Sequence, residues 1–554
     1  MPFYHQYLAG SLLAILILVP AFFNGGKNDL MGPVTFALIA ILILLTRHRE
    51  TEQKLPAASW LLLAFLGWTI VDTIFFSRRF YASIVTALPI FSGALIFLTL
   101  QISRLDKKTV KTFVYTLIGG GVMLSLYGLF LYLTPGSNLF RLGSTFYQHN
   151  AFAGFLIPIL ILSLHFFRFE PRLKFSFGLS ALILTTVLVL TFSRGGFIAA
   201  AAAIVIFFIF LGRQTNNRRS LIKSVALTSL ILAAGGLLAY GIYGIKTAKL
   251  AEVGLRSSIT PTSPYAGERP EQDETGVAAR LQYWNAAWQL IKGRPIVGSG
   301  LGSFGQEYLR VQTDPRFYSS DPHNLYLRMA AELGLIGGLL FIIFIALAII
   351  PRGLSLWRRP EENTLYAPLL AGSIGLLTHY GADIDFTFPA HVLLFFSILG
   401  LVAKPESSIL NLNIKIKPML IGASLILLLY SSISFFYNPL NPALADVEKA
   451  LRLHPYDRDT HLLAGKILAE RGDHGRAEKH FRLAITYGPA RDLEAYTQLA
   501  GLLHGLGRVE EAKTVARAGL TYFPADIFES SLWVNPNKAT IKFHRDLLVK
   551  YLNI

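Results

Sequence analysis

The sequence predicts an all-α protein: a polytopic membrane bundle of about 12–13 transmembrane helices, followed by an α-helical domain. Hydrophobic residues make up 53% of the 554 positions and charged residues only 15%, and the mean hydropathy is +0.48. Such values are typical of proteins with many spans. The first span lacks a basic n-region and a cleavage site, so it is expected to be retained. Candidate spans lie near residues 7–23, 31–46, 58–76, 81–100, 112–133, 151–167, 175–192, 196–212, 221–245, 331–350, 365–381, 386–403 and 418–437.

Lysine and arginine are distributed unevenly between alternate loops, and this bias predicts the orientation, because cytosolic loops are enriched in basic residues. With the N-terminus in the cytosol, the short loops on that side carry 20 basic residues. The thirteenth span then leaves the C-terminus outside. The net charge of +17 is mostly this cytosolic bias, and without a recognition module no nucleic-acid partner is expected. The opposite short loops carry five basic residues: Lys27, Arg78, Arg79, Arg141 and Arg194.

Arg194 is the one charge between Lys174 and Arg213, in the segment Thr191-Phe192-Ser193-Arg194-Gly195-Gly196. A charge at the centre of a bilayer costs at least a few kcal/mol. The segment is therefore predicted to form a helical hairpin that reverses at Gly195-Gly196 and places Arg194 at a water-facing tip. An arginine held there indicates an anionic ligand, although a single interfacial arginine can also serve as a snorkelling anchor.

Two hydrophilic segments are expected outside the membrane. Residues 246–325 form a long external loop within a membrane domain 1–437, and residues 438–554 form a second domain. The absence of cysteine means that no disulfide forms in either. Small residues and prolines in the second domain recur after 35 residues with the spacing of tetratricopeptide repeats, so the tail either binds an envelope protein or packs as a cap on the membrane domain. These residues are Gly465, Ala477, Ala484 and Pro489, repeated as Ala500, Ala512, Gly519 and Pro524.

The unusual polar residues gather in segments predicted to be external. Guanidinium groups that face one cleft suit a diphosphate, because each donates paired hydrogen bonds to phosphate oxygens. A neutral histidine beside them suits a general base that takes a proton from an attacking hydroxyl. Together they indicate a lipid-diphosphate substrate. The candidates are Arg141, Arg194, Arg280 in the amphipathic stretch Ala279–Trp288, His323 and Asn324 after Pro322, and His379, Asp383 and Asp385.

Three of these segments, Thr191–Gly196, Ala279–Trp288 and His323–Leu327, resemble in order and spacing the motifs of the O-antigen ligase and polymerase superfamily. The likeness covers roughly residues 10–437. Typical ligases have about 12 spans and no repeat tail, so the extra span and the tail depart from the pattern. Further matching stretches are Gly143–Phe146 followed by Asn150, Pro295–Gly302, Ala331–Gly334, and His379, Asp383, Asp385 and Pro389.

The resemblance implies an inverting, metal-independent glycosyltransferase of the bacterial inner membrane. It would use no cofactor and would move a glycan from undecaprenyl diphosphate to an acceptor hydroxyl at the periplasmic face. Arg194 and Arg280 would hold the diphosphate, Arg141 would add a third contact, and His323 would be the base. Asn324, His379, Asp383 and Asp385 would contact the acceptor or support the structure.

Ligation onto lipid A-core is the predicted reaction, and repeat-unit polymerisation or transfer to protein hydroxyls are the alternatives. Two further interpretations are a polyprenyl-glycan transporter, which would need charges at mid-membrane depth, and a scaffold whose repeat tail recruits cell-envelope partners.

Three further patterns are expected to be structural. Asp383-Ile384-Asp385 has the form of a metal-binding pair, but no further carboxylate cluster accompanies it, so no metal is expected. Gly298, Gly300 and Gly302 lack the strand and helix that flank a nucleotide site, and a turn that needs flexible backbone is expected there. Glu332 follows Arg328 by four residues, which predicts an ion pair on one helix face.

Overall fold

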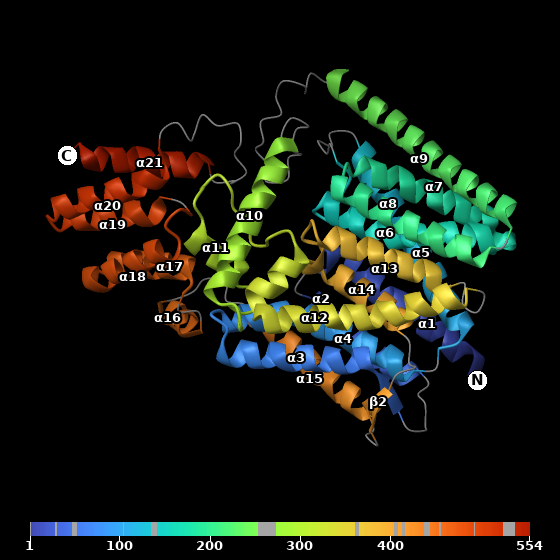
Figure 1. Ribbon diagram of the computed structural model, residues 1–554. Coiled ribbons are helices and arrows are strands. Elements are labelled where there is room, and N and C mark those ends of the chain that lie inside the picture. Colours follow the sequence, from blue (N-terminus) through green and yellow to red (C-terminus); the bar gives the residue numbers. More distant parts are fainter. Residues whose placement is uncertain are drawn as a thin grey trace. The chain divides into compact units, whose positions relative to one another are not determined.

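The structure of the protein, a computed structural model (Figure 1), is built almost entirely of helices. The middle of the predicted external loop, residues 253–272, lies outside the residues that it describes. The described residues are 2–27, 30–46, 53–103, 105–134, 141–215, 217–252, 273–360, 365–403, 408–412, 416–436, 444–453, 456–491, 493–524 and 538–553.

The chain forms two compact units. The first contains residues 1–65, 88–268 and 340–437, and the second contains residues 66–87, 269–339 and 438–554. Three helices, α3 (Ala57–Phe75), α4 (Phe80–Ile102) and α12 (Leu325–Arg358), contribute to both. The other helices of the first unit are α1 (Pro2–Phe22), α2 (Met31–Leu45), α5 (Lys107–Leu133), α6 (His149–Phe169), α7 (Lys174–Leu190), α8 (Arg194–Gln214), α9 (Arg218–Glu252), α13 (Tyr366–Tyr380), α14 (Pro389–Val402) and α15 (Ile416–Phe436), with short 3₁₀ turns η1 (Asn24–Gly26), η2 (Pro171–Leu173) and η4 (Asp385–Thr387).

Helices α6 and α14 form the centre of the first unit. Every side chain of α6 from Ala151 to Phe166 is buried, and so is every one of α14 from Ala390 to Val402. Helix α13 packs against both α6 and α8. Close approach requires small residues there: a methyl group on Gly372 would overlap Pro158, and one on Gly375 would overlap Ile157 and Ala203. Small residues at crossing points are typical of helices packed within a membrane.

Each of the predicted spans coincides with a helix, which confirms the fold class. Among the described residues, eight helices are long and apolar enough to cross a membrane. They are α3–α9 and α12, with α4 counted from Ala82, α7 from Pro171, and α9 to Ala248. The apolar parts of α1, α2, α14 and α15 are shorter, and α13 has only 15 residues. A 15-residue helix is about 22 Å long, less than the roughly 30 Å of a hydrocarbon core.

The helical hairpin around Arg194 is present, but its predicted turn was misplaced. Helix α7 ends at Leu190, and Phe192 has a positive φ of 51° that reverses the chain. Helix α8 then begins at Arg194, with Ser193 as its N-cap, so the glycines lie inside its first turn. Gly196 is required for packing instead, since a methyl group there would press against Ala153.

A two-stranded antiparallel ribbon departs from the all-α expectation. Strand β1 (Gln53–Pro56) pairs with β2 (Ser408–Leu412), in the register Gln53 to Leu412 and Pro56 to Ser408. Two loops that follow different spans can pair in this way only when both lie on the same side of the membrane. The basic-residue bias assigns both loops to the cytosolic side, so the two observations agree.

The second unit combines part of the predicted external loop with the C-terminal tail. The loop contributes α10 (Asp273–Gly293) and α11 (Phe304–Val311), which share an apolar core around Tyr283, Tyr308 and Phe317. Arg78, between α3 and α4, forms an ion pair of 2.5 Å with Glu307 on α11. The tail contains α16 (Leu444–Leu453), α17 (Arg458–Glu470), α18 (His474–Tyr487), α19 (Glu494–Gly505), α20 (Val509–Tyr522) and α21 (Lys538–Leu552).

The tail helices pack in sequence, α17 on α18 and α19 on α20 (Figure 1). Two of the repeated small residues lie at these crossings. A methyl group on Gly465 would overlap Phe481, and one on Gly519 would press on Tyr496. The tail also contacts the rest of its unit. Arg79 and Asp457 form an ion pair of 3.2 Å, and Arg491 stacks 3.6 Å above the ring of Tyr318. These contacts agree with the packing role for the tail, while the tetratricopeptide assignment and a protein partner stay predictions.

Arg79→Glu is expected to loosen the tail. The substitution would place two carboxylates together where Arg79 and Asp457 now pair, and Asp457 also caps α17 by accepting from Thr460 N. Loss of about 1 kcal/mol raises local opening about fivefold, which hydrogen exchange in α17 would report. Arg517→Glu, on the exposed tail surface, is the matched control. Equal exchange in the two variants would contradict a docking role for this ion pair.

A histidine pair in the tail is expected to make its stability depend on pH. His461 and His480 lie on α17 and α18 with their Nδ1 atoms 2.9 Å apart. Burial lowers the pKa of His480, and the charges of His461, Arg476 and Lys479 act in the same direction. Because the folded pKa lies below the unfolded value of about 6.5, the unfolded tail binds more protons in acid, and stability falls as the pH drops below about 6.5.

Protection from hydrogen exchange in α17 and α18 should therefore be lower at about pH 5.5 than at about pH 7.5, after correction for intrinsic rates. His480→Gln should remove much of this difference, because glutamine carries no titrating proton. Unchanged protection of the original protein at both pH values would contradict the prediction.

Candidate active site

Arg194 occupies the first position of α8, where its side chain is exposed. Ser193 forms the cap, because its hydroxyl accepts from Gly196 N at 3.0 Å. The first turn of a helix carries partial positive charge, so a cation placed there adds to it. A guanidinium and the amide groups of a helix N-terminus together attract an anion. The phosphate-binding role of Arg194 stays a prediction.

The loop that carries Arg141 is attached to the same hairpin. Leu142 N donates to Leu190 O at 3.0 Å, which ties the residue after Arg141 to the end of α7. The guanidinium of Arg141 lies 3.1 Å from His149 Nε2 at the start of α6. Because a guanidinium only donates, this contact requires a neutral His149 with Nε2 as acceptor. Arg141 and Arg194 are thus held by neighbouring segments of the first unit.

His379 and Asp385 are a buried pair beneath the first turn of α8. His379 Nδ1 lies 2.5 Å from Asp385 Oδ2, and both side chains are 0% exposed. A methyl group on Gly154 would overlap Asp385, and one on Gly195 would lie 3.5 Å from His379 Nε2. The pair therefore packs α13 and η4 against α6 and α8. This buried pair lies against the turn that carries Arg194, and its role in acceptor contact or structural support stays a prediction.

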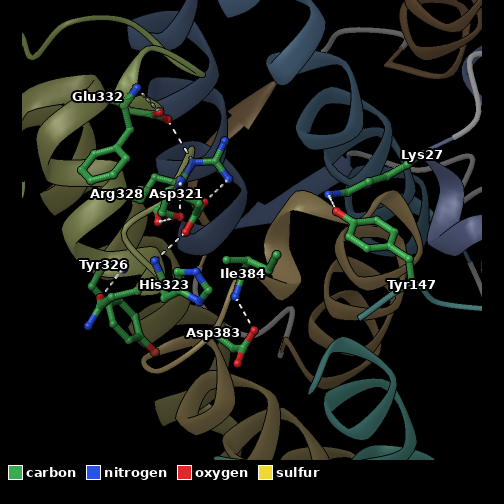
Figure 2. A network of polar contacts seen from close by, with 12 residues as sticks. Lys27, Tyr147, Asp321, His323, Tyr326, Arg328, Glu332, Asp383 and Ile384 are labelled. Carbon is green, nitrogen blue, oxygen red and sulfur yellow. Dashed lines mark hydrogen bonds and ion pairs between the residues drawn. The ribbon is translucent and has the colours of Figure 1, made fainter. Parts of the chain in front are cut away.

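Asp383 also serves the backbone. Its Oδ1 accepts from Ile384 N at 2.9 Å, in the turn before η4 (Figure 2). Asp383 and Asp385 therefore have different partners, although only Ile384 separates them. Over the described ranges, no group of three or more His, Cys, Asp or Glu side chains is arranged to hold a metal ion.

His323 lies in a tightly bonded turn of the second unit (Figure 2). It has a positive φ of 55°, and its amide donates to Asp321 Oδ1 at 2.8 Å. Asn324 Oδ1 accepts from Tyr326 N and Leu327 N, both at 3.0 Å, and so caps the start of α12. His323 thus lies two residues before the start of α12 at Leu325. Asn324 therefore supports the start of α12, and an acceptor contact of this residue stays a prediction.

A buried ion network fixes this turn. Arg328 pairs with Asp321 at 3.1 Å and with Glu332 at 3.0 Å, which confirms the predicted contact between Arg328 and Glu332. Glu332 extends the network, because its carboxylate accepts from Phe304 N at 3.1 Å at the start of α11. Buried charges are tolerated when each has a partner. The network thus holds the His323 turn, α12 and α11 in one arrangement.

The glycine-rich stretch before α11 is a turn, as expected. Gly298, Gly300 and Gly302 have φ values of 70°, 96° and 70°, which glycine adopts without strain. The main-chain oxygen of Glu332 accepts from Ser299 N at 3.1 Å and from Gly300 N at 2.7 Å. The turn therefore packs on α12 and its amides are used internally.

Arg280 and His323 share one scaffold through Tyr283. Tyr283 follows Arg280 by three residues on α10, and residues at this spacing are neighbours on a helix surface. Its ring stacks on the imidazole of His323, with centroids 5.5 Å apart and planes 21° from parallel. The Tyr283 hydroxyl lies 3.3 Å from Tyr318 O. Arg280 itself is half-buried, with Nη1 3.3 Å from Gly276 O.

The predicted site residues thus fall into two groups. Arg141, Arg194, His379, Asp383 and Asp385 belong to the first unit, and Arg280, His323 and Asn324 belong to the second. Sequence reasoning missed Tyr283 and Asp321 as supports of His323. Their signals were short spacings: Tyr283 lies one helical turn from Arg280, and Asp321 lies two residues before His323, where an aspartate commonly bonds the backbone two residues on.

Comparison with known proteins matches residues 179–342 to a family model described as O-Antigen ligase. The matched segment runs from α7 into α12 and contains Arg194, Arg280 and His323. No curated protein matches the chain. Family and fold together assign a ligase- or glycosyltransferase-type role in O-antigen or polysaccharide assembly, with glycan donor and acceptor as substrates in the membrane. Residues 179–342 are therefore similar to the O-antigen ligase family, and this match together with the apolar helices indicates a multi-pass bacterial membrane protein that resembles the O-antigen ligase and polymerase superfamily.

Proposed function

We propose that the protein transfers a glycan from undecaprenyl diphosphate to an acceptor hydroxyl at the periplasmic face of the bacterial inner membrane, with lipid A-core as the acceptor. One observation carries this proposal. The segment that matches the O-antigen ligase family contains Arg194, Arg280 and His323, the three residues whose chemistry indicates a lipid-diphosphate donor. The scaffold around His323 supports it, because several contacts fix the position of this one imidazole.

The proposed reaction is a single inverting displacement. The acceptor hydroxyl oxygen attacks the anomeric carbon on the side opposite the diphosphate, and His323 takes the hydroxyl proton. The bond between the anomeric carbon and the phosphate oxygen breaks, and its electron pair leaves with undecaprenyl diphosphate. Arg194 and Arg280, with Arg141 as a third contact, stabilise the charge that develops on this leaving group. The arginines supply positive charge at the phosphates, so the proposed step needs no divalent metal.

Surface glycans from a deletion strain test the proposal. Loss of all long glycan chains from lipid A-core, with free lipid-linked chains retained, is the result expected of a ligase. Chains shortened to one repeat unit would instead identify a polymerase, and a missing protein glycan would identify a protein oligosaccharyltransferase. Unaltered glycans would contradict all three reactions and favour a transporter or a scaffold.

The tail is proposed to lie outside the cytosol. The ion pair between Arg79 and Asp457 supports this, because it requires the tail and the turn between α3 and α4 to be on one side of the membrane. The basic-residue bias assigns that turn to the outside. A reporter that is active only in the cytosol should therefore be silent when fused after Ile554. A bright reporter there, with a silent one fused within the turn at Arg78, would contradict the predicted topology.

A further inference from the structure

A cationic cavity lies between helices of the first unit, apart from the candidate active site. It has a volume of about 220 Å³ and is formed by residues of α6, α7, α8 and α9. Three of its lining residues are basic: Arg168, Lys174 and Lys223. All three belong to loops that the charge bias assigns to the cytosolic side. General anchoring at that surface explains their charge but not their gathering around one cavity.

The position of Arg168 in the cavity is fixed. Its Nε donates to Ser224 Oγ at 2.8 Å and its Nη2 to Ser220 Oγ at 2.5 Å. A guanidinium has five N–H donors, so these two bonds leave donors for an anion. Ser220 lies in the first turn of α9, and Lys174 is the first residue of α7. The positive ends of two helix dipoles therefore add to the three side-chain charges.

Nearby acidic groups do not neutralise the cavity. The closest carboxylate in sequence, Glu170, pairs with Lys111 at 2.8 Å and accepts from the Tyr115 hydroxyl at 2.9 Å. Over the part of the chain that the structure describes, Arg168 and the two cavity lysines form no ion pair within 4.0 Å. The cavity thus concentrates positive charge that an anion would balance.

An apolar groove continues from this cavity. It has a volume of about 330 Å³, runs between α7 and α9, and shares Phe167 and Leu227 with the cavity. Phe175 is 83% exposed at its edge, and Leu230 is 65% exposed farther along α9. Gly178 contributes to the opening, because a side chain there would meet the ring of Phe167. The groove follows two candidate spans, so its natural contents are hydrocarbon chains.

We propose that the cavity and the groove together bind one anionic phospholipid. Its phosphate would lie among Arg168, Lys174 and Lys223, with the serine hydroxyls fixing the guanidinium, and one acyl chain would lie in the groove between α7 and α9. Basic pockets between spans on the cytosolic side bind anionic head groups. A neutral lipid would leave the charges unbalanced, and a free phosphate would leave the groove without its chain. The proposal is independent of the transfer reaction.

Native mass spectrometry of the full-length protein tests the site. The protein is exposed to equal amounts of phosphatidylglycerol and phosphatidylcholine, and bound lipid is measured. Preferential retention of phosphatidylglycerol is expected. Lys223→Glu and Arg168→Ala should each weaken it about fivefold or more, because each basic residue near an anionic lipid contributes about that factor. Lys107→Glu, on the same predicted side but outside the cavity, is the matched control and should change nothing.

Two further measurements separate the parts of the site. Gly178→Leu should fill the groove and reduce retention of phosphatidylglycerol, and unchanged retention would show that no chain lies there. Glycerol phosphate, which has the head-group charge but no chain, should compete poorly, and strong competition would mean a simple phosphate site. Equal retention of the two lipids by the original protein would overturn the proposal. The melting temperature of each variant in phosphatidylcholine identifies any that fails to fold.

Discussion

Replacement of His323 is expected to abolish most turnover while leaving donor binding intact. An alcohol is a poor nucleophile at neutral pH, and a general base in contact with it contributes about 10²–10⁴ in rate. His323→Ala should therefore lower transfer by that factor, with unchanged affinity for the lipid-diphosphate donor. Transfer is measured as glycan appearing on acceptor, and affinity as retention of labelled donor in lipid nanodiscs.

His323→Asn is the more informative variant at this position. His323 adopts φ of 55°, a conformation that asparagine tolerates and alanine does not favour. Asparagine thus keeps the turn but cannot accept a proton in the reaction. His474→Ala, an exposed histidine in the tail, is the control. If both His323 variants lost donor binding in proportion to turnover, the histidine would be a phosphate ligand, and another group would have to act as the base.

Arg194→Lys is expected to fold and insert but to lose about a hundredfold in activity. A guanidinium binds phosphate through a planar pair of donors that an ammonium cannot reproduce. A lost charge-assisted contact of roughly 2–3 kcal/mol corresponds to that factor. The loss should appear in donor affinity as well as in turnover, unlike the loss in His323→Ala. Arg280→Lys should behave in the same way.

Arg172→Lys, an exposed position in η2, provides the matched control for this exchange. A snorkelling anchor needs only a positive charge, so lysine would replace it without loss. Full activity of Arg194→Lys would therefore support the anchoring role and contradict the phosphate-binding role.

The helices could be predicted from the sequence because long apolar runs leave the backbone no other way to satisfy its hydrogen bonds in a membrane. The details of the turns could not be predicted from the sequence. Gly195 and Gly196 suggested a reversal, yet Phe192 makes it, and Gly196 serves the packing of α8. A glycine pair carries the same signal for flexibility and for close approach, and only the three-dimensional neighbours decide between them.

For the candidate site, too, the kinds of residue could be predicted from the sequence, but their contacts in space could not. The types of residue that bind a diphosphate could be found from chemistry, and their order along the chain could be matched to a family. The stacking of Tyr283 on His323 joins residues 40 positions apart, and no local pattern predicts it. The sequence left acceptor contact and structural support open for His379 and Asp385, and their complete burial became visible only in the structure.

Reconstitution of the transfer reaction tests the central claim most directly. Purified full-length protein in nanodiscs is supplied with undecaprenyl-diphosphate-linked glycan and lipid A-core, in the presence of excess chelator. We expect glycan on lipid A-core, an inverted anomeric linkage, and one undecaprenyl diphosphate released for each glycan transferred. Both the transfer and the release should be lost in His323→Asn. Release without transfer, retention of the anomeric configuration, or unchanged activity of His323→Asn would contradict the account.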